Sequence, residues 1–359
     1  MRYIGITILL VLCLTLLLLT GCRVNTAIPK TASGNLENQK DINQSSNNFQ
    51  SSSTDSVQES TEEPETENPQ KWSGLTGFTT WYGYAPGAAD TWLDNGFTET
   101  RDLRNYLDTD SVNASKAAVI TANSKGLKFI WGVGAQNITA SNWPTFRQAI
   151  LDAAQWAQDN GVYEFQLGNE EELHVDGTTM TIEEIITNLK SVATDVQEIF
   201  TNGNVSYSCW QNTIDDWAVA GKGDIDILAS NVYMGGNGSY SEIWKTRITN
   251  LVNTFGVDGT YLTEFAPSYS SLEDYSKDEK VQAAGVTKMI EHMKDSGITR
   301  ALFYSWHDYP SGLFGAVKND GTYRLLWNQA LLNSGSVKSI TVPVKTTIIS
   351  ILDTIAPLL

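Results

Sequence analysis

The chain has 359 residues, with 41 acidic against 24 basic side chains and a formal net charge of −17 at pH 7. This charge excludes nucleic acid as a partner, because binding to a phosphate backbone depends on clusters of Lys and Arg. Hydrophobic residues make up 41% of the chain, and aromatic residues make up 10% of it. This is enough for a folded core and excludes a wholly disordered chain.

The first 21 residues are predicted to be a secretory signal. Arg2 supplies a positive charge, and an apolar run follows over residues 4–19. The letters LTGC at residues 19–22 resemble the bacterial lipobox, whose cysteine is acylated and becomes the mature N-terminus. The resemblance implies lipidation at Cys22 and an extracytoplasmic protein that is lipid-anchored to a bacterial cell membrane. The alternative is an ordinary signal peptide or anchor helix with an incidental cysteine, and a signal peptide would give a secreted protein.

Residues 22–71 are predicted to be a disordered tether. The segment is rich in Ser, Asn, Gln, Thr and Glu, contains the run EEPETE at residues 62–67, and has Phe49 as its only aromatic residue. Such a composition cannot bury enough apolar surface to fold. We therefore expect a solvated spacer that lets an anchored domain reach away from the membrane.

From Trp72 onward, short apolar runs alternate with helical stretches, which predicts βα units around a parallel sheet. One helical pattern covers residues 143–159, and Ser/Thr-x-x-Glu capping signals begin at Thr181, Ser239 and Ser276. Eight strands fit the sequence: residues 76–82, 97–102, 127–133, 163–168, 205–209, 225–233, 260–264 and 300–306.

Eight βα units in about 260 residues is the size of a TIM barrel. The predicted fold class is therefore α/β, with a single (β/α)8 domain over residues 72–335. A doubly wound sheet is the alternative, but the first strand is not followed by a Gly-x-Gly-x-x-Gly turn. The tail, residues 336–359, is apolar with interrupting charges, and no role is assigned to it.

The strand ends carry the candidate chemistry, because the active site of a TIM barrel lies at the C-terminal ends of its strands. The fourth predicted strand closes in Gly-Asn-Glu, ending at Glu170, and the seventh closes in Leu-Thr-Glu, ending at Glu264. The topology thus brings Glu170 and Glu264 to one mouth of the barrel. Paired carboxylates in such an arrangement are what glycoside hydrolysis needs.

On these residues the chain resembles the clan A glycoside hydrolases, the (β/α)8 group that holds many cellulases, mannanases and xylosidases. The likeness covers residues 72 to about 332. It implies a retaining hydrolase that cleaves β-linked poly- or oligosaccharide by double displacement, without a cofactor. At the matching positions it implies that Glu170 is the general acid/base, Glu264 the nucleophile, and Asn169 the group that holds the sugar 2-hydroxyl.

Three further positions agree with the resemblance. It implies that Arg101, closing strand two, hydrogen-bonds the nucleophile, that Tyr233, closing strand six, lies beside it, and that Trp306, closing strand eight, is a sugar-stacking platform. A nucleophilic Glu must stay ionised, and a nearby arginine stabilises that form. The charge of Glu264 would in turn favour the protonated form of Glu170, as a general acid requires. Carboxylates about 5 to 5.5 Å apart would give retention of configuration.

The sequence departs from the family directly after the Asn-Glu pair. Pro is common there, whereas this chain has Glu171 and Glu172, so that three acids lie in a row. Glu170 is preferred as the acid because it adjoins Asn169 at the strand end. Glu171 and Glu172 are expected to face solvent or substrate-binding groups.

Three more residues are expected to bind substrate at the mouth. Trp81 closes strand one and would stack on a sugar or pack in the core, while His174 and His307 follow strands four and eight. No His or Cys spacing typical of zinc occurs, so no metal is expected, and bound calcium stays open.

The expected partner is a carbohydrate bound by a monomer, with membrane contact only through the N-terminal anchor. One rival function is a non-catalytic surface carbohydrate-binding lipoprotein on the same scaffold, and another is a tethered structural or adhesive domain. The paired carboxylates favour the hydrolase. The sugar, the linkage, the choice between endo and exo cutting and the family within the clan stay open, because subsites are built by βα loops.

Overall fold

The computed structural model describes residues 74–80, 88–234, 242–267, 278–308 and 314–331. Cys22, the predicted signal, tether and C-terminal tail, and Trp81 lie outside the described residues, as do the helix-start residues Ser239 and Ser276. None of the helices within the described ranges has the length and hydropathy that a bilayer span requires.

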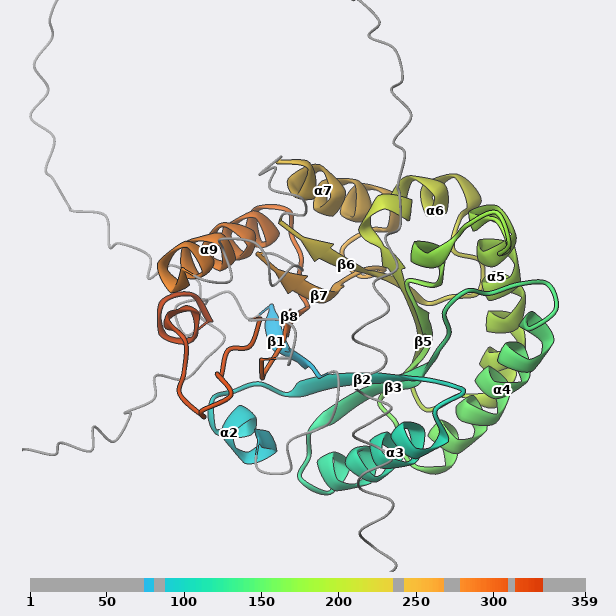
Figure 1. Ribbon diagram of the computed structural model, residues 1–359, viewed down its shortest axis with the longest axis horizontal. Coiled ribbons are helices and arrows are strands. Elements are labelled where there is room, and N and C mark those ends of the chain that lie inside the picture. Colours follow the sequence, from blue (N-terminus) through green and yellow to red (C-terminus); the bar gives the residue numbers. More distant parts are fainter. Residues whose placement is uncertain (1–73, 81–87, 235–241, 268–277, 309–313, 332–359) are drawn as a thin grey trace, which may run out of the picture. The chain divides into compact units, whose positions relative to one another are not determined.

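Eight parallel strands form a closed barrel in chain order, with β1 paired to both β2 and β8 (Figure 1). The helices lie in a ring outside the strands (Figure 1), so the predicted TIM barrel is confirmed. The strands are β1 (Leu75–Thr79), β2 (Glu99–Asn105), β3 (Lys128–Gly134), β4 (Glu164–Asn169), β5 (Asn204–Trp210), β6 (Ile227–Tyr233), β7 (Leu262–Ala266) and β8 (Ala301–Tyr304).

The helices follow their sequence signals closely. The predicted helix at residues 143–159 is α4 (Trp143–Asp159), and Thr181 forms a reciprocal capping box with Glu184 at the start of α5 (Ile182–Ile199). Helix α9 (Glu279–Asp295) is capped by Asp278, whose carboxylate accepts two backbone N–H bonds, so it begins later than the capping motif at residue 276 predicts. The others are α2 (Ala88–Asp94), α3 (Thr109–Ser124), α6 (Ile214–Ala220), α7 (Ile243–Phe255) and the short turns η1 (Glu171–His174), η2 (Gln211–Thr213) and η3 (Trp327–Leu331).

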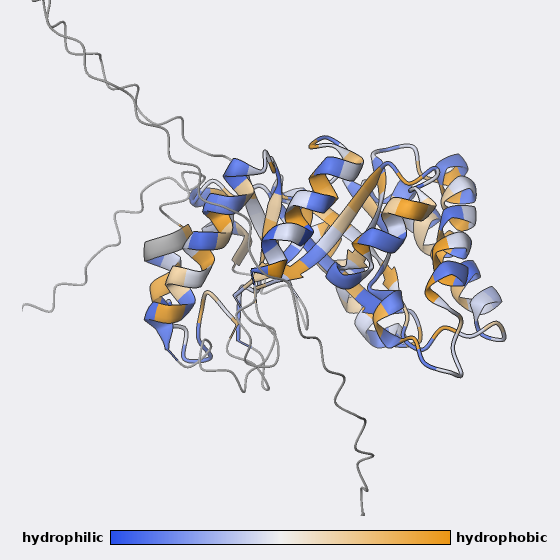
Figure 2. Ribbon diagram, turned by 90° about the horizontal axis from the view of Figure 1, so that it is seen from above, coloured by the Kyte–Doolittle hydropathy of each residue, from blue (hydrophilic) through white to orange (hydrophobic). Residues whose placement is uncertain are grey.

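Alternation along the strands divides the core into two parts. Along β3, Phe129, Trp131 and Val133 belong to the large core packed under the helices, and hydrophobic segments recur along those helices in Figure 2. Ile130 has the opposite orientation and belongs to a smaller cluster inside the barrel, whose other members are Ile227, Ala229, Tyr261 and Leu302. Trp131 is therefore a core residue.

Buried polar groups cap this inner cluster at both ends of the barrel. At the N-terminal end, the Arg300 guanidinium pairs with Glu99 at 2.8 Å and Glu164 at 2.5 Å, and Tyr261 donates a hydrogen bond to Glu164. At the C-terminal end the inward side chains are also polar and buried: Thr79, Arg101, Gln166, Ser208, Asn231 and Thr263. In a TIM barrel, the side chains at the C-terminal end of the strands lie next to the active site.

Four strand ends differ from the prediction by two or three residues, and the first of them is β1, which ends at Thr79. Strand β2 continues to Asn105, which puts Arg101 inside the strand, and β7 continues to Ala266 beyond Glu264. Strand β8 ends at Tyr304, so Trp306 lies beyond it.

Candidate active site

Glu264 is a buried carboxylate held from two sides. It is 3% exposed, and one of its oxygens accepts a hydrogen bond from Arg101 Nη1 at 2.6 Å. The other accepts a hydrogen bond from the Tyr233 hydroxyl. Burial and the charge of Glu264 raise the pKa of Tyr233 well above its usual range, so the phenol stays protonated and can donate. A guanidinium and a phenol donor together stabilise the ionised carboxylate and fix its orientation.

Arg101 joins three strands through one fully buried guanidinium. Besides the Glu264 bond, its Nε donates to Gln166 Oε1 at 2.6 Å and its Nη2 donates to Asn169 Oδ1 at 2.5 Å. The planar group thereby connects β2 to both β4 and β7. These fixed donor directions set the relative position of Asn169 and Glu264.

The hydrogen bonds around Asn169 determine which way its amide points. Its Oδ1 accepts from Arg101 and from Asn231 Nδ2, the latter at 3.0 Å. Asn231 is oriented in turn, since its own Oδ1 accepts from Ser208 at 2.9 Å and from Thr263 at 2.8 Å. With its oxygen directed into the barrel, Asn169 presents its NH₂ group to the cavity that it lines. An amide donor there suits a substrate hydroxyl.

Glu170 has a half-buried side chain and an unusual backbone. Its φ of 56° and ψ of 35° are left-handed, a conformation that costs a non-glycine residue about 1–3 kcal/mol. Burial, followed by the charge of Glu264, raises the pKa of Glu170 well above its usual range, and a hydrogen bond from Asn231 offsets part of this effect. The two acids therefore differ: Glu264 is paired with a cation, and Glu170 favours its protonated form.

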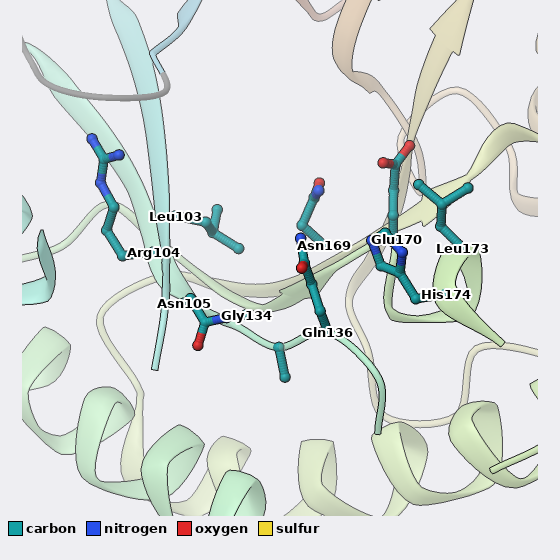
Figure 3. A pocket seen from close by; sticks show the side chains of 10 residues that line it. Leu103, Arg104, Asn105, Gly134, Gln136, Asn169, Glu170, Leu173 and His174 are labelled. Atoms are coloured by element: carbon teal, nitrogen blue, oxygen red, sulfur yellow. The ribbon is translucent and has the colours of Figure 1, made fainter. Parts of the chain in front are cut away.

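Two cavities meet at Glu170, and Leu173 also lines both. The first, of about 210 Å³, is bounded by the ends of β2, β3 and β4 and by η1, and the second, of about 240 Å³, lies toward β5, β6 and β8. In Figure 3 the side chains of Asn169 and Glu170 project in the same direction, with Arg104 on the far side of the first cavity. Other residues lining the first are Leu103, Asn105, Gly134, Ala135, Gln136 and His174, and the second adds Trp210, Gln211, Asn212, Tyr233, Tyr304 and Phe314.

The structure brings together most of the site residues expected from the sequence. Glu170, Asn169 and His174 line the first cavity, and Tyr233 lines the second while donating to Glu264. His307 is exposed and lines neither cavity formed by the described residues, and Trp81 lies outside those residues.

Trp306 does not occupy the expected platform position. It is 5% exposed and packs edge-on against Phe78, Trp92 and Trp327, with ring centroids 5.0 to 5.6 Å apart. Because β8 ends two residues earlier, the residue of β8 that lines the second cavity is Tyr304. Alternation could have identified it, since Tyr304 lies two positions after the inward-facing Leu302.

Glu171 and Glu172 do not face solvent, which corrects the expectation drawn from the sequence. Each is 1% exposed. Glu171 accepts backbone N–H bonds from Asn169 and Ala135, and Glu172 accepts from side chains of β5 and α6. Sequence reasoning missed this because buried acids need partners that lie elsewhere in the chain. It likewise missed Asn231 and Gln166, which neighbour apolar strand residues and carry no motif of their own.

No cluster of three or more His, Cys, Asp or Glu side chains suited to a metal ion occurs among the described residues. Cys209, at the end of β5, is a buried free thiol.

Known proteins are similar to this chain in fold. No protein-family model matches it, and no curated protein does. An exo-β-1,4-mannosidase from Opitutaceae bacterium strain TAV5 superposes with a TM-score of 0.57 at 12% identity over 73% of this chain and 59% of its own. A Bacteroides uniformis β-glucuronidase gives 0.58 at 12% identity, covering 74% and 35% of the two chains.

The catalytic domain of the major endoglucanase from Xanthomonas campestris pv. campestris gives a TM-score of 0.54 at 11% identity, over 73% of this chain and 94% of its own. This chain spans less than two thirds of the mannosidase and of the glucuronidase. The protein therefore shares a (β/α)8 fold with these glycoside hydrolases, and at this level of identity the likeness concerns the fold.

Proposed function

We propose that the protein is a retaining glycoside hydrolase that cleaves β-linked poly- or oligosaccharide. The observation that carries the proposal is a pair of acids in opposite environments at the C-terminal end of the barrel. Glu264 is held by Arg101 and Tyr233, whereas burial and neighbouring charge raise the pKa of Glu170. One ionised and one protonated carboxyl group are the two states that double displacement requires.

In the first step, a Glu264 oxygen attacks the anomeric carbon while Glu170 donates its proton to the departing glycosidic oxygen. The products are a glycosyl ester on Glu264 and a free leaving-group alcohol. Esterification removes the charge of Glu264, which is one of the causes that raise the pKa of Glu170. Glu170, now ionised, takes a proton from water, and the hydroxide oxygen displaces Glu264 from the anomeric carbon.

The remaining groups position the sugar. The Asn169 NH₂ group is free to donate to a hydroxyl next to the anomeric carbon, and Tyr233 and Tyr304 have ring centroids 5.9 Å apart at the second cavity. Aromatic faces suit the apolar faces of pyranose rings. We further propose that the enzyme acts outside the cytoplasm from a lipid anchor at Cys22, on the lipobox resemblance alone.

The experiment is an assay of the protein on β-glucans, mannan, xylan and chitin, with released reducing ends as the readout. The matched control is the Glu170→Gln/Glu264→Gln double variant, which keeps the side-chain volumes and removes both acids. Release that only the wild type supports would establish the hydrolase and its glycan class. Binding without release would contradict the proposal and favour the non-catalytic carbohydrate-binding protein.

A further inference from the structure

Two buried carboxylates lie directly after the candidate acid, where nothing in the mechanism above uses them. Glu171 and Glu172 are both 1% exposed, in the turn η1 that follows Glu170. Burying a carboxylate is costly unless its oxygens are hydrogen-bonded. Two adjacent buried acids therefore need a compensating set of partners, and those partners indicate what the pair does.

Glu171 ties the turn to the ends of two strands. One of its oxygens accepts N–H bonds from Asn169 at 3.0 Å and from Ala135 at 3.2 Å, which join it to β4 and to the end of β3. Two glycines make room for it. A Cβ added at Gly168 would lie 2.5 to 2.6 Å from the Glu171 carboxyl group, and one at Gly134 would lie 3.3 Å from its Oε1. The backbone on both sides is thus shaped around this carboxyl group.

Glu172 ties the same turn to the other side of the barrel. Its oxygens accept from the Tyr207 hydroxyl at 2.5 Å and from Trp217 Nε1 at 2.6 Å, which belong to β5 and α6. The Tyr207 oxygen also accepts the Glu171 backbone N–H at 3.1 Å. The two carboxylates and the phenol therefore hold both sides of one short turn.

The residue at the start of this turn is Glu170, with its left-handed backbone. Its N–H donates to the Ser208 carbonyl at 2.9 Å, and its own carbonyl accepts from Leu173 at 2.9 Å. Such a conformation persists only where the surroundings impose it. In Figure 3 the Glu170 side chain projects beside that of Asn169, the residue whose N–H Glu171 holds.

We propose that Glu171 and Glu172 are positioning residues for Glu170, holding the turn after β4 in the one conformation that directs the acid into the cleft. This rests on the proposed hydrolase function, since positioning is defined by the proton that Glu170 delivers. A purely structural pair would serve as well with apolar residues of similar volume. If the pair positions Glu170, replacing either residue should selectively lower acid catalysis.

The test compares kcat/KM for phenyl and dinitrophenyl β-glycosides of the sugar that the wild type releases. Phenolate is a poor leaving group and departs as phenol, with a proton from Glu170, whereas dinitrophenolate departs without a proton. We expect Glu171→Ala to lower kcat/KM for the phenyl glycoside about 10- to 100-fold and to leave the dinitrophenyl glycoside nearly unchanged. Glu171→Gln should retain wild-type values, because the amide oxygen can accept the same two N–H bonds.

A second variant tests the same contact from the opposite side. Gly168→Ala should displace the Glu171 carboxyl group and reproduce the Glu171→Ala pattern even where Glu171→Ala fails to fold. Glu183→Gln, an exposed acid on α5, is the matched control. Equal losses on both glycosides, or no loss in folded Glu171→Ala and Gly168→Ala, would overturn the inference. A wild type inactive on all glycans would instead overturn the proposed function, and the inference with it.

Glu172 has a separate readout in the pH profile. Burial is the largest cause that raises the pKa of Glu170. The negative charges of Glu264 and Glu172 add to it, against a hydrogen bond from Asn231 and the charge of Arg101. The phenol of Tyr233 also faces this pair of acids. Removing one negative charge in Glu172→Gln should make Glu170 ionise more easily, so the alkaline limb of kcat/KM should shift to lower pH. An unmoved limb with a wild-type rate would contradict the role of Glu172.

Discussion

Replacing Arg101 by alanine is expected to destabilise the barrel as well as the site. The substitution removes three hydrogen bonds of 2.5 to 2.6 Å from a fully buried guanidinium and leaves Glu264 without its cation. Charge-assisted bonds contribute about 1.5–3 kcal/mol each, but Glu264 keeps Tyr233 and Asn169 keeps Asn231. The expected loss is therefore that of a broken buried ion pair, about 3–5 kcal/mol in the free energy of unfolding.

The assay is urea unfolding followed by circular dichroism, with Arg147→Ala as the control. Arg147 forms an equally short pair with Asp195 at 2.5 Å, but those side chains are 38% and 42% exposed. Exposed ion pairs contribute about 0–1 kcal/mol to the free energy of unfolding. The control therefore separates the effect of burial from the effect of a short distance between the charged groups.

The double variant Arg101→Met/Glu264→Met separates lost pairing from lost packing. It removes both charges, and replacing a buried ion pair with apolar side chains is often close to neutral. We expect it to be more stable than Arg101→Ala, although inactive. A loss below about 1 kcal/mol for Arg101→Ala, equal to that of Arg147→Ala, would refute the reasoning, because the buried carboxylate would then need no cation.

Two other predictions concern stability and the anchor. Burial raises the pKa of Glu171 to about 7 and that of Asp102 to about 6, so the folded state binds protons more tightly than the unfolded chain, and stability should fall as pH rises from about 4.5 to 7. Urea unfolding at a series of pH values should show that Glu171 lowers the free energy of unfolding by about 3 kcal/mol over this range, and Glu171→Gln should abolish that loss. A free energy of unfolding that rises with pH in this range, or the same pH dependence in the variant, would contradict the prediction. In a bacterial host, Cys22→Ser should release the protein from the membrane fraction and abolish palmitate labelling, whereas retention would favour an anchor helix.

The sequence predicts the barrel well because strand and helix signals are local. Helix α4 and the capping box at Thr181 lie where apolar spacing and the capping motif put them. The positions of Glu170 and Glu264 follow from topology, since parallel strand ends meet at one mouth. An apolar run does not reveal where β8 ends: the strand was predicted to reach Trp306 but ends at Tyr304, and the Trp306 ring packs into the core.

The environments of the acids could not be read from the sequence, because each depends on residues far apart in the chain. Arg101 reaches Glu264 across 163 positions, and Asn231 reaches Asn169 across 62. For the same reason, the three consecutive acids at residues 170–172 look alike in the sequence but have three different environments in the folded protein. Glu170 opens into the cleft, Glu171 is enclosed by strand ends, and Glu172 is bound by side chains of β5 and α6.

The different surroundings of these three acids indicate which of them suits proton donation. A carboxyl group that donates a proton must reach the substrate and must also favour its neutral form, which requires a desolvated place near negative charge. Glu170 has both, since it lines the two cavities while burial and the charges of Glu264 and Glu172 raise its pKa. Glu171 is desolvated as well, but it lines neither of the two cavities described above. For the proposed hydrolase, access to the cleft therefore favours Glu170 over Glu171 as the acid.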